Sequence, residues 1–413
     1  MNIKVNGKRT WDELEQLSTF SDTPAPSVTR IIYTENDLKA RNYFKGLARE
    51  AGLEVREDAI GNIFARLNGD DKSLPAIGTG SHCDAIPHAG KYDGTVGVFG
   101  GLEALRSLKE GGFKPRRPLE VVFFTSEEPT RFGIGCIGSR LMAGAITVDH
   151  IHTLKDKDGL SVDQARAAAG YSGDLSSAIL PPKYYEYFVE LHIEQGPVLE
   201  REKIEIGAVT AIAAPASFRI HFTGQAGHAG SVLMPQRKDA LVPAAILIAE
   251  LESLAKNSDS PDSVGTVGVV KVHPGAINSI PGKVTVEFDI RDIKLSTRDG
   301  IVHEIHRRAR QLAEERSLQV EIEMINSDPP AISHETILQA IEESATLQGY
   351  SKMRLVSRAY HDSLFMARIA PMAMIFVPSK NGYSHRPDEY TSPEEIERGV
   401  QILAMTMSKL SHA

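Results

Sequence analysis

Short, continuously apolar segments alternate along most of this 413-residue chain with segments whose apolar residues recur at helical spacing. The first kind is typical of strands buried on both faces, and the second kind is typical of amphipathic helices. Such a chain is predicted to form an α/β sheet covered by helices on both faces. The expected strands are residues 75–84, 118–128, 186–196 and 372–379, and the expected helices are 36–51, 94–110 and 392–410.

A different pattern fills the middle of the chain. There the expected strands alternate apolar and polar residues, and the elements follow the order β-α-β-β-α-β of split, ferredoxin-like domains. These elements are strands 217–225, 263–274, 283–292 and 318–325 and helices 237–256 and 297–316. The sequence therefore predicts an α/β domain of residues 1–213 and 327–413, interrupted by an inserted α+β domain of residues 214–326.

Composition and charge exclude several classes of protein. The net charge is -8, with 46 Lys and Arg against 54 Asp and Glu, so binding to nucleic acid is not expected. The two cysteines, Cys83 and Cys136, exclude a disulfide scaffold and favour a reducing compartment. The first twenty residues hold no apolar core of signal-peptide length, and no run approaches the ~20 apolar residues of a membrane helix. We therefore expect a soluble, cytoplasmic protein with no membrane partner.

The first polar cluster, GSHCDAIPHAGKYDG at residues 80–94, follows the expected strand 75–84. It places His82, Asp84 and Asp93 where ligands gather in open α/β sheets. Asp84 is predicted to orient the His82 ring by accepting its second N–H, as outer carboxylates do for metal-binding histidines. By itself the segment is better explained as a surface loop with incidental polar residues.

The second cluster, TSEEPTRFG at residues 125–133, follows the expected strand 118–128 and presents Glu127 beside Glu128. Unpaired charges next to a buried run are costly. A metal ion would compensate one carboxylate, and the other would then serve as a general base. Taken alone, the solvated start of a loop is the simpler explanation.

Two histidines lie near the ends of further expected strands: His192 in ELHIEQGP and His385 in GYSHRPDEY. A single histidine in such a place is more often a satisfied core residue than a ligand. Together the clusters supply three histidines and two carboxylates near strand ends of one domain. That set suits two divalent ions sharing one carboxylate, and it favours Mn, Zn, Co or Ni over Ca or an iron–sulfur cluster.

The inserted domain carries a different set of polar residues: His228 in AGHAGS, Asn278 in HPGAINSIPG and Arg291 at the end of strand 283–292. Arg291 offers planar, bidentate recognition of a carboxylate. The alternatives are a solvated strand end for Arg291 and ordinary turn chemistry for Asn278.

These blocks, in this order, resemble the amidohydrolase branch of the dinuclear-metal aminopeptidase/carboxypeptidase superfamily. That branch holds N-carbamoyl-L-amino acid hydrolases, β-ureidopropionases, allantoate amidohydrolases and ureidoglycolate amidohydrolases. The resemblance runs from about residue 10 to the C-terminus. It implies a dinuclear-metal peptidase-like catalytic domain, with an inserted lid domain that closes over the metals and forms a homodimer interface.

The resemblance also implies a set of metal ligands. They would be His82, Asp93, Glu128, His192 and His385. Asp93 would bridge two ions, with His82 and His192 completing one site and Glu128 and His385 the other.

The same resemblance implies roles for residues outside the ligand set. Glu127 would be the general base, and His228 would reach the site of a partner subunit and stabilise the oxyanion. Asn278 and Arg291 would hold a substrate carboxylate, and Gln195 would touch a ureido group.

Within this branch, TSEEPTRFG, TAIAAPAS, HPGAINSIPG, SRAYHDSLFMARI and GYSHRPDEY are most similar to the ureidoglycolate amidohydrolases. Tyr383 stands where allantoate and carbamoyl-amino-acid enzymes usually have a small or aliphatic residue, and it would narrow the pocket for a small substrate. The implied substrate is a small ureido-carboxylate, and the implied reaction is hydrolysis of ureidoglycolate to glyoxylate, ammonia and carbon dioxide in purine catabolism. The expected cofactors are two divalent ions per subunit: Mn²⁺ first, with Zn²⁺, Co²⁺ or Ni²⁺ as alternatives.

Other activities stay open at this point. N-carbamoyl-L-amino acid hydrolase, β-ureidopropionase and allantoate amidohydrolase are the nearest alternatives. A dipeptidase is more distant, because the metal ligands do not depend on the substrate but Arg291 with Asn278 argues against a peptide. A non-catalytic binding protein would be expected to have lost a ligand or the base, and all six positions are filled here.

Overall fold

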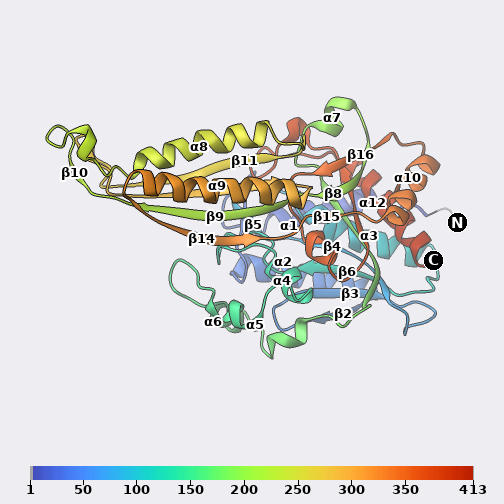
Figure 1. Ribbon diagram of the computed structural model, residues 1–413. Helices are drawn as coiled ribbons and strands as arrows, with labels where there is room; N and C mark the ends of the chain where they lie inside the picture. Colours follow the sequence, from blue (N-terminus) through green and yellow to red (C-terminus); the bar gives the residue numbers. More distant parts are fainter. Residues whose placement is uncertain (1–2, 413) are drawn as a thin grey trace. The chain divides into compact units, whose positions relative to one another are not determined.

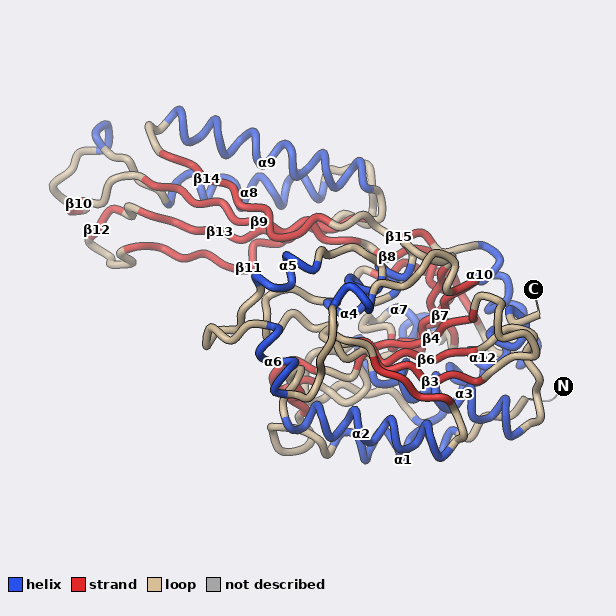
Figure 2. Tube along the Cα trace, turned by 90° about the horizontal axis from the view of Figure 1, so that it is seen from below, coloured by secondary structure: helices blue, strands red, loops and turns tan. Residues whose placement is uncertain are grey.

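The computed structural model describes residues 3–412, and the chain divides into two compact units (Figures 1 and 2). The first unit comprises Met1–Ala211, Ile332–Ser357 and His361–Ala413, and the second comprises Ile212–Ala331 with Arg358–Tyr360. That these units are separate catalytic and lid domains, with boundaries after residues 213 and 326, stays a prediction. Residues 1, 2 and 413, which the predicted catalytic domain includes, lie outside the described residues.

Among residues 3–412, the first unit is built on a mixed sheet of nine strands. Eight of them follow the order β15-β8-β17-β7-β4-β6-β3-β2, and β16 pairs with β8. The strands are β15 (Ala331–Ile332), β8 (Ile206–Ile212), β17 (Met372–Val377), β7 (Tyr185–Ile193), β4 (Ala76–His82), β6 (Leu119–Phe124), β3 (Ile63–Leu67), β2 (Glu54–Glu57) and β16 (Lys352–Ser357).

The four central strands, β17, β7, β4 and β6, are parallel to one another. Every residue of β4, β6 and β17 is buried, as expected for parallel strands with both faces covered. The α/β fold class predicted from the apolar runs is thereby confirmed. Because parallel strands end at the same edge of a sheet, the polar segments that follow these strands are brought together there.

One hydrophobic core joins the sheet to five helices. They are α1 (Gly7–Ser18), α2 (Glu35–Glu50), α3 (Thr95–Glu110), α10 (Glu335–Gln348) and α12 (Pro393–Leu410). Leu191 of β7 belongs to this core. Its neighbour Glu190, on the opposite face of the strand, accepts the backbone N–H of Ser363 from α11 (Ser363–Met366) at 3.0 Å. The sheet therefore has chain packed on both faces.

Several short elements were not predicted from the sequence. Helices α4 (Ile137–Met142), α5 (Val148–Thr153) and α6 (Val162–Ala168) contribute to a separate apolar cluster. The remaining short elements of this unit are β1 (Val28–Arg30), β5 (Ala85–Ala89), α7 (Val198–Glu202) and the 3-10 turns η1 (Leu175–Ala178) and η3 (Lys380–Gly382). None of the helices within residues 3–412 combines the length and the apolar character needed to cross a membrane.

The second unit confirms the predicted order β-α-β-β-α-β. Its four-stranded antiparallel sheet has the order β11-β13-β9-β14, and two helices pack on the apolar face of the strands. The elements are β9 (Ala214–Thr223), α8 (Leu241–Lys256), β11 (Val264–His273), β13 (Lys283–Asp292), α9 (Leu295–Glu315) and β14 (Gln319–Ser327). A small ladder of β10 (Gly227–His228) and β12 (Ser279–Ile280), with the turn η2 (Met234–Gln236), lies beyond the Thr223 end of β9.

Helix α3 approaches the parallel strands very closely at Gly97. A Cβ atom at this position would lie 2.3 Å from the carbonyl oxygen of Leu191 and 2.7 Å from Cβ of Ser81. Both neighbours belong to central strands, so they cannot move away without shifting the strand backbone that leads into the polar segments. Glycine is therefore what allows α3 to pack at this depth.

Gly97→Ala should lower the free energy of unfolding of the first unit by about 1–3 kcal/mol, the cost of overpacking a filled core. Gly46→Ala is the matched control, because Gly46 is in the interior of α2 with open space around it. That control should raise stability by about 0.5–1 kcal/mol through helix propensity. Urea unfolding followed by far-ultraviolet circular dichroism measures both. Equal midpoints for Gly97→Ala and the parent would contradict the packing described here.

Candidate metal centre and active site

The polar residues singled out in the sequence lie at the carboxyl edge of the parallel strands. His82 ends β4 and His192 is next to last in β7, while Glu127 and Glu128 follow β6 after two residues. Asp93 comes from the segment before α3. The parallel register fixes these ends side by side, so side chains far apart in the sequence converge.

The first group consists of His82, His192 and Asp93. Nε2 of His82 lies 3.6 Å from Oδ1 of Asp93, and Nε2 of His192 lies 3.3 Å from the same oxygen. Nδ1 of His82 lies 3.0 Å from the carbonyl oxygen of Asp84, and Nδ1 of His192 lies 2.9 Å from that of Ile193. A carbonyl only accepts, so Nδ1 carries the hydrogen in both rings and Nε2 is the nitrogen that faces Asp93. Nε2 of His192 also accepts the backbone N–H of Gly94 at 3.0 Å.

The second group consists of Asp93, Glu128 and His385. Nε2 of His385 lies 3.4 Å from Oδ2 of Asp93 and 3.2 Å from Oε1 of Glu128. In each group the potential ligand atoms all lie within 4.8 Å of one another. The two oxygens of Asp93 thus face different groups, which is the arrangement a bridging carboxylate needs.

The electrostatics of these residues favour cations. Burial alone would raise the pKa of Asp93, but the imidazoles of His192, His385 and His82 hold that pKa well below its usual range. Asp93 and Glu128 in turn raise the pKa of His385 to about 11. The site therefore stabilises positive charge beside its buried carboxylates. Mixed imidazole and carboxylate groups in this number fit divalent metal ions.

Glu127 is placed differently from the ligands. One of its oxygens, Oε2, lies 3.7 Å from Nε2 of His82, and Oε1 accepts a contact from the Cys136 thiol at 3.6 Å. Burial raises the pKa of Glu127 well above its usual range, and Glu128 adds to the effect. Glu127 lies beside the two groups and belongs to neither of them, and its role as a general base stays a prediction.

The predicted role of Asp84 is wrong in its atomic detail. Its backbone carbonyl, rather than its carboxylate, faces Nδ1 of His82, and the nearest carboxylate oxygen is 3.7 Å from that nitrogen. The carboxylate instead accepts the backbone N–H of Glu127 at 3.2 Å and that of Glu128 at 3.0 Å. The physical reason is that the turn after β6 leaves two inward-pointing amides that need an acceptor. Asp84 therefore holds the two glutamates in place.

Gln195 also lies within the metal centre. Its side-chain N–H donates to Oδ2 of Asp93 at 2.6 Å, and its Oε1 is buried with no hydrogen-bond partner among the described residues. The backbone of Gln195 is left-handed, with φ 55°. Contact with a ureido group stays a prediction for this residue, whose carbonyl oxygen is poised to accept one N–H.

Four residues near the ligands were missed by sequence reasoning. Ser384 and Glu389 contact Asp93 or its backbone, and Glu190 and His361 form a third buried group with His192. The motifs GYSHRPDEY and SRAYHDSLFMARI contain three of them. Their spacing in the sequence does not distinguish these residues from ordinary polar residues of a surface loop, because their contacts form only when the strands are assembled.

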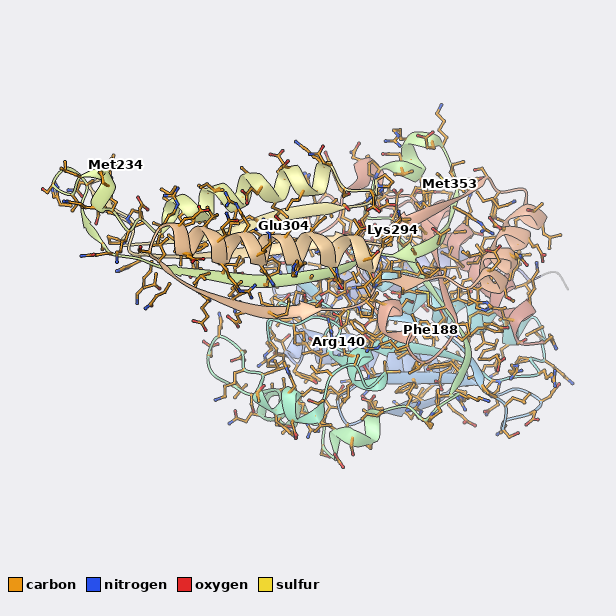
Figure 3. All side chains as sticks on the ribbon, in the orientation of Figure 1. Arg140, Phe188, Met234, Lys294, Glu304 and Met353 are labelled. Carbon is orange, nitrogen blue, oxygen red and sulfur yellow. The ribbon has the colours of Figure 1, made fainter. Side chains whose placement is uncertain are left out.

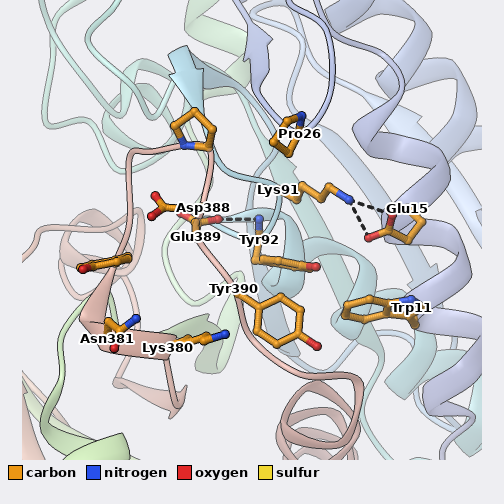
Figure 4. A pocket seen from close by; sticks show the side chains of 12 residues that line it. Trp11, Glu15, Pro26, Lys91, Tyr92, Lys380, Asn381, Asp388, Glu389 and Tyr390 are labelled. Atoms are coloured by element: carbon orange, nitrogen blue, oxygen red, sulfur yellow. Dashed lines mark hydrogen bonds and ion pairs between the residues drawn. The ribbon is translucent and has the colours of Figure 1, made fainter.

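Tyr383 lines a cavity of about 660 Å³ in the first unit (Figure 4). Trp11, Tyr92 and Tyr390 form an aromatic wall of this cavity. Glu389 also lines the cavity and accepts the backbone N–H of Tyr92. The Tyr383 ring is covered by the guanidinium of Arg386 at 3.8 Å. That Tyr383 narrows a substrate pocket stays a prediction.

The predicted catalytic and substrate-binding residues of the second unit fall into two places. His228 pairs with Ser279 in the β10–β12 ladder, and the carbonyl of Asn278 accepts the N–H of Ala229 at 2.8 Å. Arg291 lies near the other end of β13, where Nε donates to Asp289 at 2.7 Å. The structure thus brings His228 and Asn278 together and leaves Arg291 apart from them.

Comparison with known proteins agrees with this chemistry. The model of Peptidase family M20/M25/M40 matches residues 78–409. The chain belongs to this family. Membership implies divalent metal ions, for which the clusters around Asp93 provide ligands. The family resemblance inferred from the motifs is confirmed.

Individual members of the family are similar over the whole chain. The ureidoglycolate hydrolase of Arabidopsis thaliana is 50% identical, covering 99% of this chain and 88% of that protein. The N-carbamoyl-L-amino-acid amidohydrolase of Paenarthrobacter aurescens is 36% identical, covering 98% of each. The crystal structure of AtUAH in complex with glyoxylate matches with a TM-score of 0.90 at 50% identity, covering 100% of this chain and 99% of that one.

Metal stoichiometry tests the two groups separately. Asp93→Ala should lose both ions, because each group includes one oxygen of Asp93, whereas His385→Ala should lose one. Glu127→Gln should retain both ions and lose roughly 10²-fold or more in turnover, the scale of general acid–base catalysis. Plasma mass spectrometry on desalted protein gives the ion count. One ion retained in Asp93→Ala would exclude the bridging role, and loss of metal in Glu127→Gln would make Glu127 a ligand.

Proposed function

We propose that this protein is a metal-dependent amidohydrolase that cleaves the ureido C–N bond of ureidoglycolate, giving glyoxylate, ammonia and carbon dioxide. The observation that carries the proposal is the 50% identity over nearly the whole chain to a ureidoglycolate hydrolase. Support comes from the assembled set of three histidines and two carboxylates with a separate buried glutamate. The N-carbamoyl-L-amino acid hydrolases, at lower identity, are the second candidate.

The proposed metal ligands are His82, Asp93 and His192 for one ion and Asp93, Glu128 and His385 for the other. Bound there, two divalent ions would activate a water molecule and polarise the ureido carbonyl. Manganese is the ion we propose first. A homodimer and a cytoplasmic location are proposed with it, on the resemblance and the composition alone.

Glu127 performs the proton transfers in this mechanism. It takes a proton from the attacking water and returns it to the nitrogen that leaves as ammonia. The carbamate that remains loses carbon dioxide, and the resulting hydroxyglycine collapses to glyoxylate and a second ammonia. Asp84 keeps the base in register by holding its backbone N–H. Gln195 holds the Asp93 side chain by donating to its Oδ2.

The geometry of the second unit restricts how its residues serve a substrate. Lys283 and Arg291 are eight residues apart on β13, which at ~3.4 Å per residue is about 27 Å. His228 and Asn278 lie beyond the Lys283 end. In Figure 3, Met234 and Lys294, which follow the two sites in the chain, mark the opposite ends of this unit. One small ureido acid cannot touch both ends of one chain.

We therefore propose that the two ends serve different metal centres of a dimer. Arg291 would bind the substrate carboxylate at the centre of its own chain, while His228 and Asn278 would act at the centre of the partner. The predicted pairing of Asn278 and Arg291 on one carboxylate then requires residues from two chains. Arg291 must also exchange Asp289 for the substrate, because that carboxylate holds its guanidinium in this structure.

Mixed dimers test this arrangement. A heterodimer of His228→Ala and Arg291→Ala chains, isolated with two different tags, should recover about half of the parental activity, because one of its two sites has every group intact. Each variant alone should be nearly inactive. The matched control is the heterodimer of Glu127→Gln and Arg291→Ala, in which both sites stay defective. Recovery in the control, or none in the test pair, would contradict the assignment.

A substrate panel tests the proposed reaction. Ureidoglycolate, allantoate, several N-carbamoyl-amino acids, β-ureidopropionate and a dipeptide would be assayed for release of ammonia and glyoxylate. The assays would use Mn²⁺, Zn²⁺ and chelated protein. Ureidoglycolate should give the highest kcat/KM, and chelation should abolish turnover. Preference for a carbamoyl-amino acid would replace the proposed substrate, and full activity after chelation would remove the metal mechanism.

A further inference from the structure

Glu389 connects two segments that the metal centre uses. Its Oε1 accepts the backbone N–H of Tyr92 at 2.7 Å and that of Asp93 at 3.1 Å. Its Oε2 accepts the hydroxyl of Ser384 at 2.9 Å. One carboxylate therefore reaches both the segment of Asp93 and the segment immediately before His385. In Figure 4 a dashed line joins the Glu389 carboxylate to the backbone nitrogen of Tyr92.

Ser384 extends this connection to the Asp93 side chain. Its Oγ lies within hydrogen-bond distance of both Oε2 of Glu389 and Oδ2 of Asp93. A hydroxyl has one hydrogen, so it donates to one carboxylate at a time. Glu389 is thus connected to Asp93 in two ways. One runs from its Oε2 through the Ser384 hydroxyl to the Asp93 side chain, and the other from its Oε1 to the Asp93 backbone N–H.

The surrounding chain is shaped to admit Glu389. The residue is 4% exposed, and a Cβ atom on Gly90 would lie 2.3 Å from its Cβ and 2.4 Å from Oε1. A buried carboxylate is costly unless its oxygens accept hydrogen bonds. Here Oε1 accepts two amides, and Oε2 lies within hydrogen-bond distance of the Ser384 hydroxyl. Without Glu389, the amides of Tyr92 and Asp93 would lose their acceptor.

We propose that Glu389 is a positioning residue of the metal centre, holding the bridging Asp93 and the His385 segment at a fixed separation. The inference rests on the proposed metal centre and is independent of the substrate. It acts through hydrogen bonds rather than through the charge of the carboxylate. Since Asp93 belongs to both ligand groups, the binding of both ions depends on Glu389.

The test measures the binding of Mn²⁺ to chelator-stripped protein, using the electron paramagnetic resonance signal of free Mn²⁺. Glu389→Ala should weaken Mn²⁺ binding by roughly 10- to 100-fold, the range for outer partners of metal ligands. Glu389→Gln should stay close to the parent, because its carbonyl still accepts both amides and its NH₂ donates to Ser384. Equal loss in the two variants, or no loss in Glu389→Ala, would overturn the proposal.

Two further variants keep the test decisive if Glu389→Ala fails to fold. Gly90→Ala displaces the Glu389 side chain without changing its chemistry, and Ser384→Ala cuts the path to the Asp93 side chain. Both should weaken Mn²⁺ binding. The matched control is Glu205→Ala, which removes a carboxylate that accepts the N–H and hydroxyl of Ser351 at 2.7 and 3.1 Å. That control should bind Mn²⁺ as the parent does, and parental affinity in Gly90→Ala and Ser384→Ala would also overturn the proposal.

Trp11 provides a second readout that does not depend on metal. It is the only tryptophan of the chain, and its ring stacks on Tyr92 with centroids 5.7 Å apart. Loosening of the Tyr92–Asp93 segment should therefore change the emission of Trp11 in Glu389→Ala and leave it unchanged in Glu205→Ala. Weaker Mn²⁺ binding with unchanged Trp11 emission would contradict positioning.

The outcomes also separate this inference from the proposed function. Parent protein that binds two Mn²⁺ ions but cleaves no ureido substrate would refute the function and leave Glu389 to be judged by its variants. Parent protein that turns over ureidoglycolate, with variants that bind Mn²⁺ normally, would refute only the role of Glu389.

Discussion

The carboxylate of Asp93 is the group on which the rest of the candidate metal centre depends. Its two oxygens face different sets of candidate ligands, so a shift of Asp93 would change the geometry of both sets. Its side chain is held by Gln195 and Ser384 and its backbone by Glu389. The parallel sheet contributes the opposite wall, because the ends of β4 and β7 cannot shift without breaking the strand register. Many of the surrounding hydrogen bonds therefore hold this one residue in position.

Four of the ten non-glycine residues with a left-handed backbone among residues 3–412 lie around the same centre. Ser126, Cys136, Gln195 and His385 all have left-handed backbone conformations without being glycine. Each costs of order 1–2 kcal/mol for a residue with a Cβ atom, and the surrounding packing must supply it. Ser126 turns the chain so that both following glutamates face the centre, and His385 itself is a proposed ligand. The strain is consistent with side chains aimed by the fold rather than by local preference.

The sequence was most informative where burial is uniform. The strands of the parallel sheet could be predicted because both of their faces are covered. The proposed ligands came from the family resemblance, since the polar residues after each strand are a weak signal one by one. Strands β2, β3 and β16 are short and partly exposed, so no periodicity marked them. The contacts of Glu389 and the carboxylate of Asp84 could not be predicted, since each joins a side chain to amides of a distant segment. The separation of Asn278 from Arg291 follows only from the register of β13.

The position of β17 has a consequence for synthesis on the ribosome. This strand lies between β7 and β8 in the sheet, yet it is made only at residues 372–377. Until then β7 and β8 have no common neighbour, and their unpaired edges are open to wrong partners. The second unit is almost continuous from Ile212 to Ala331, so all of its strands are made before β17. Nascent chains should thus pass through a stage in which the inserted region is complete but the nine-stranded sheet still lacks β17.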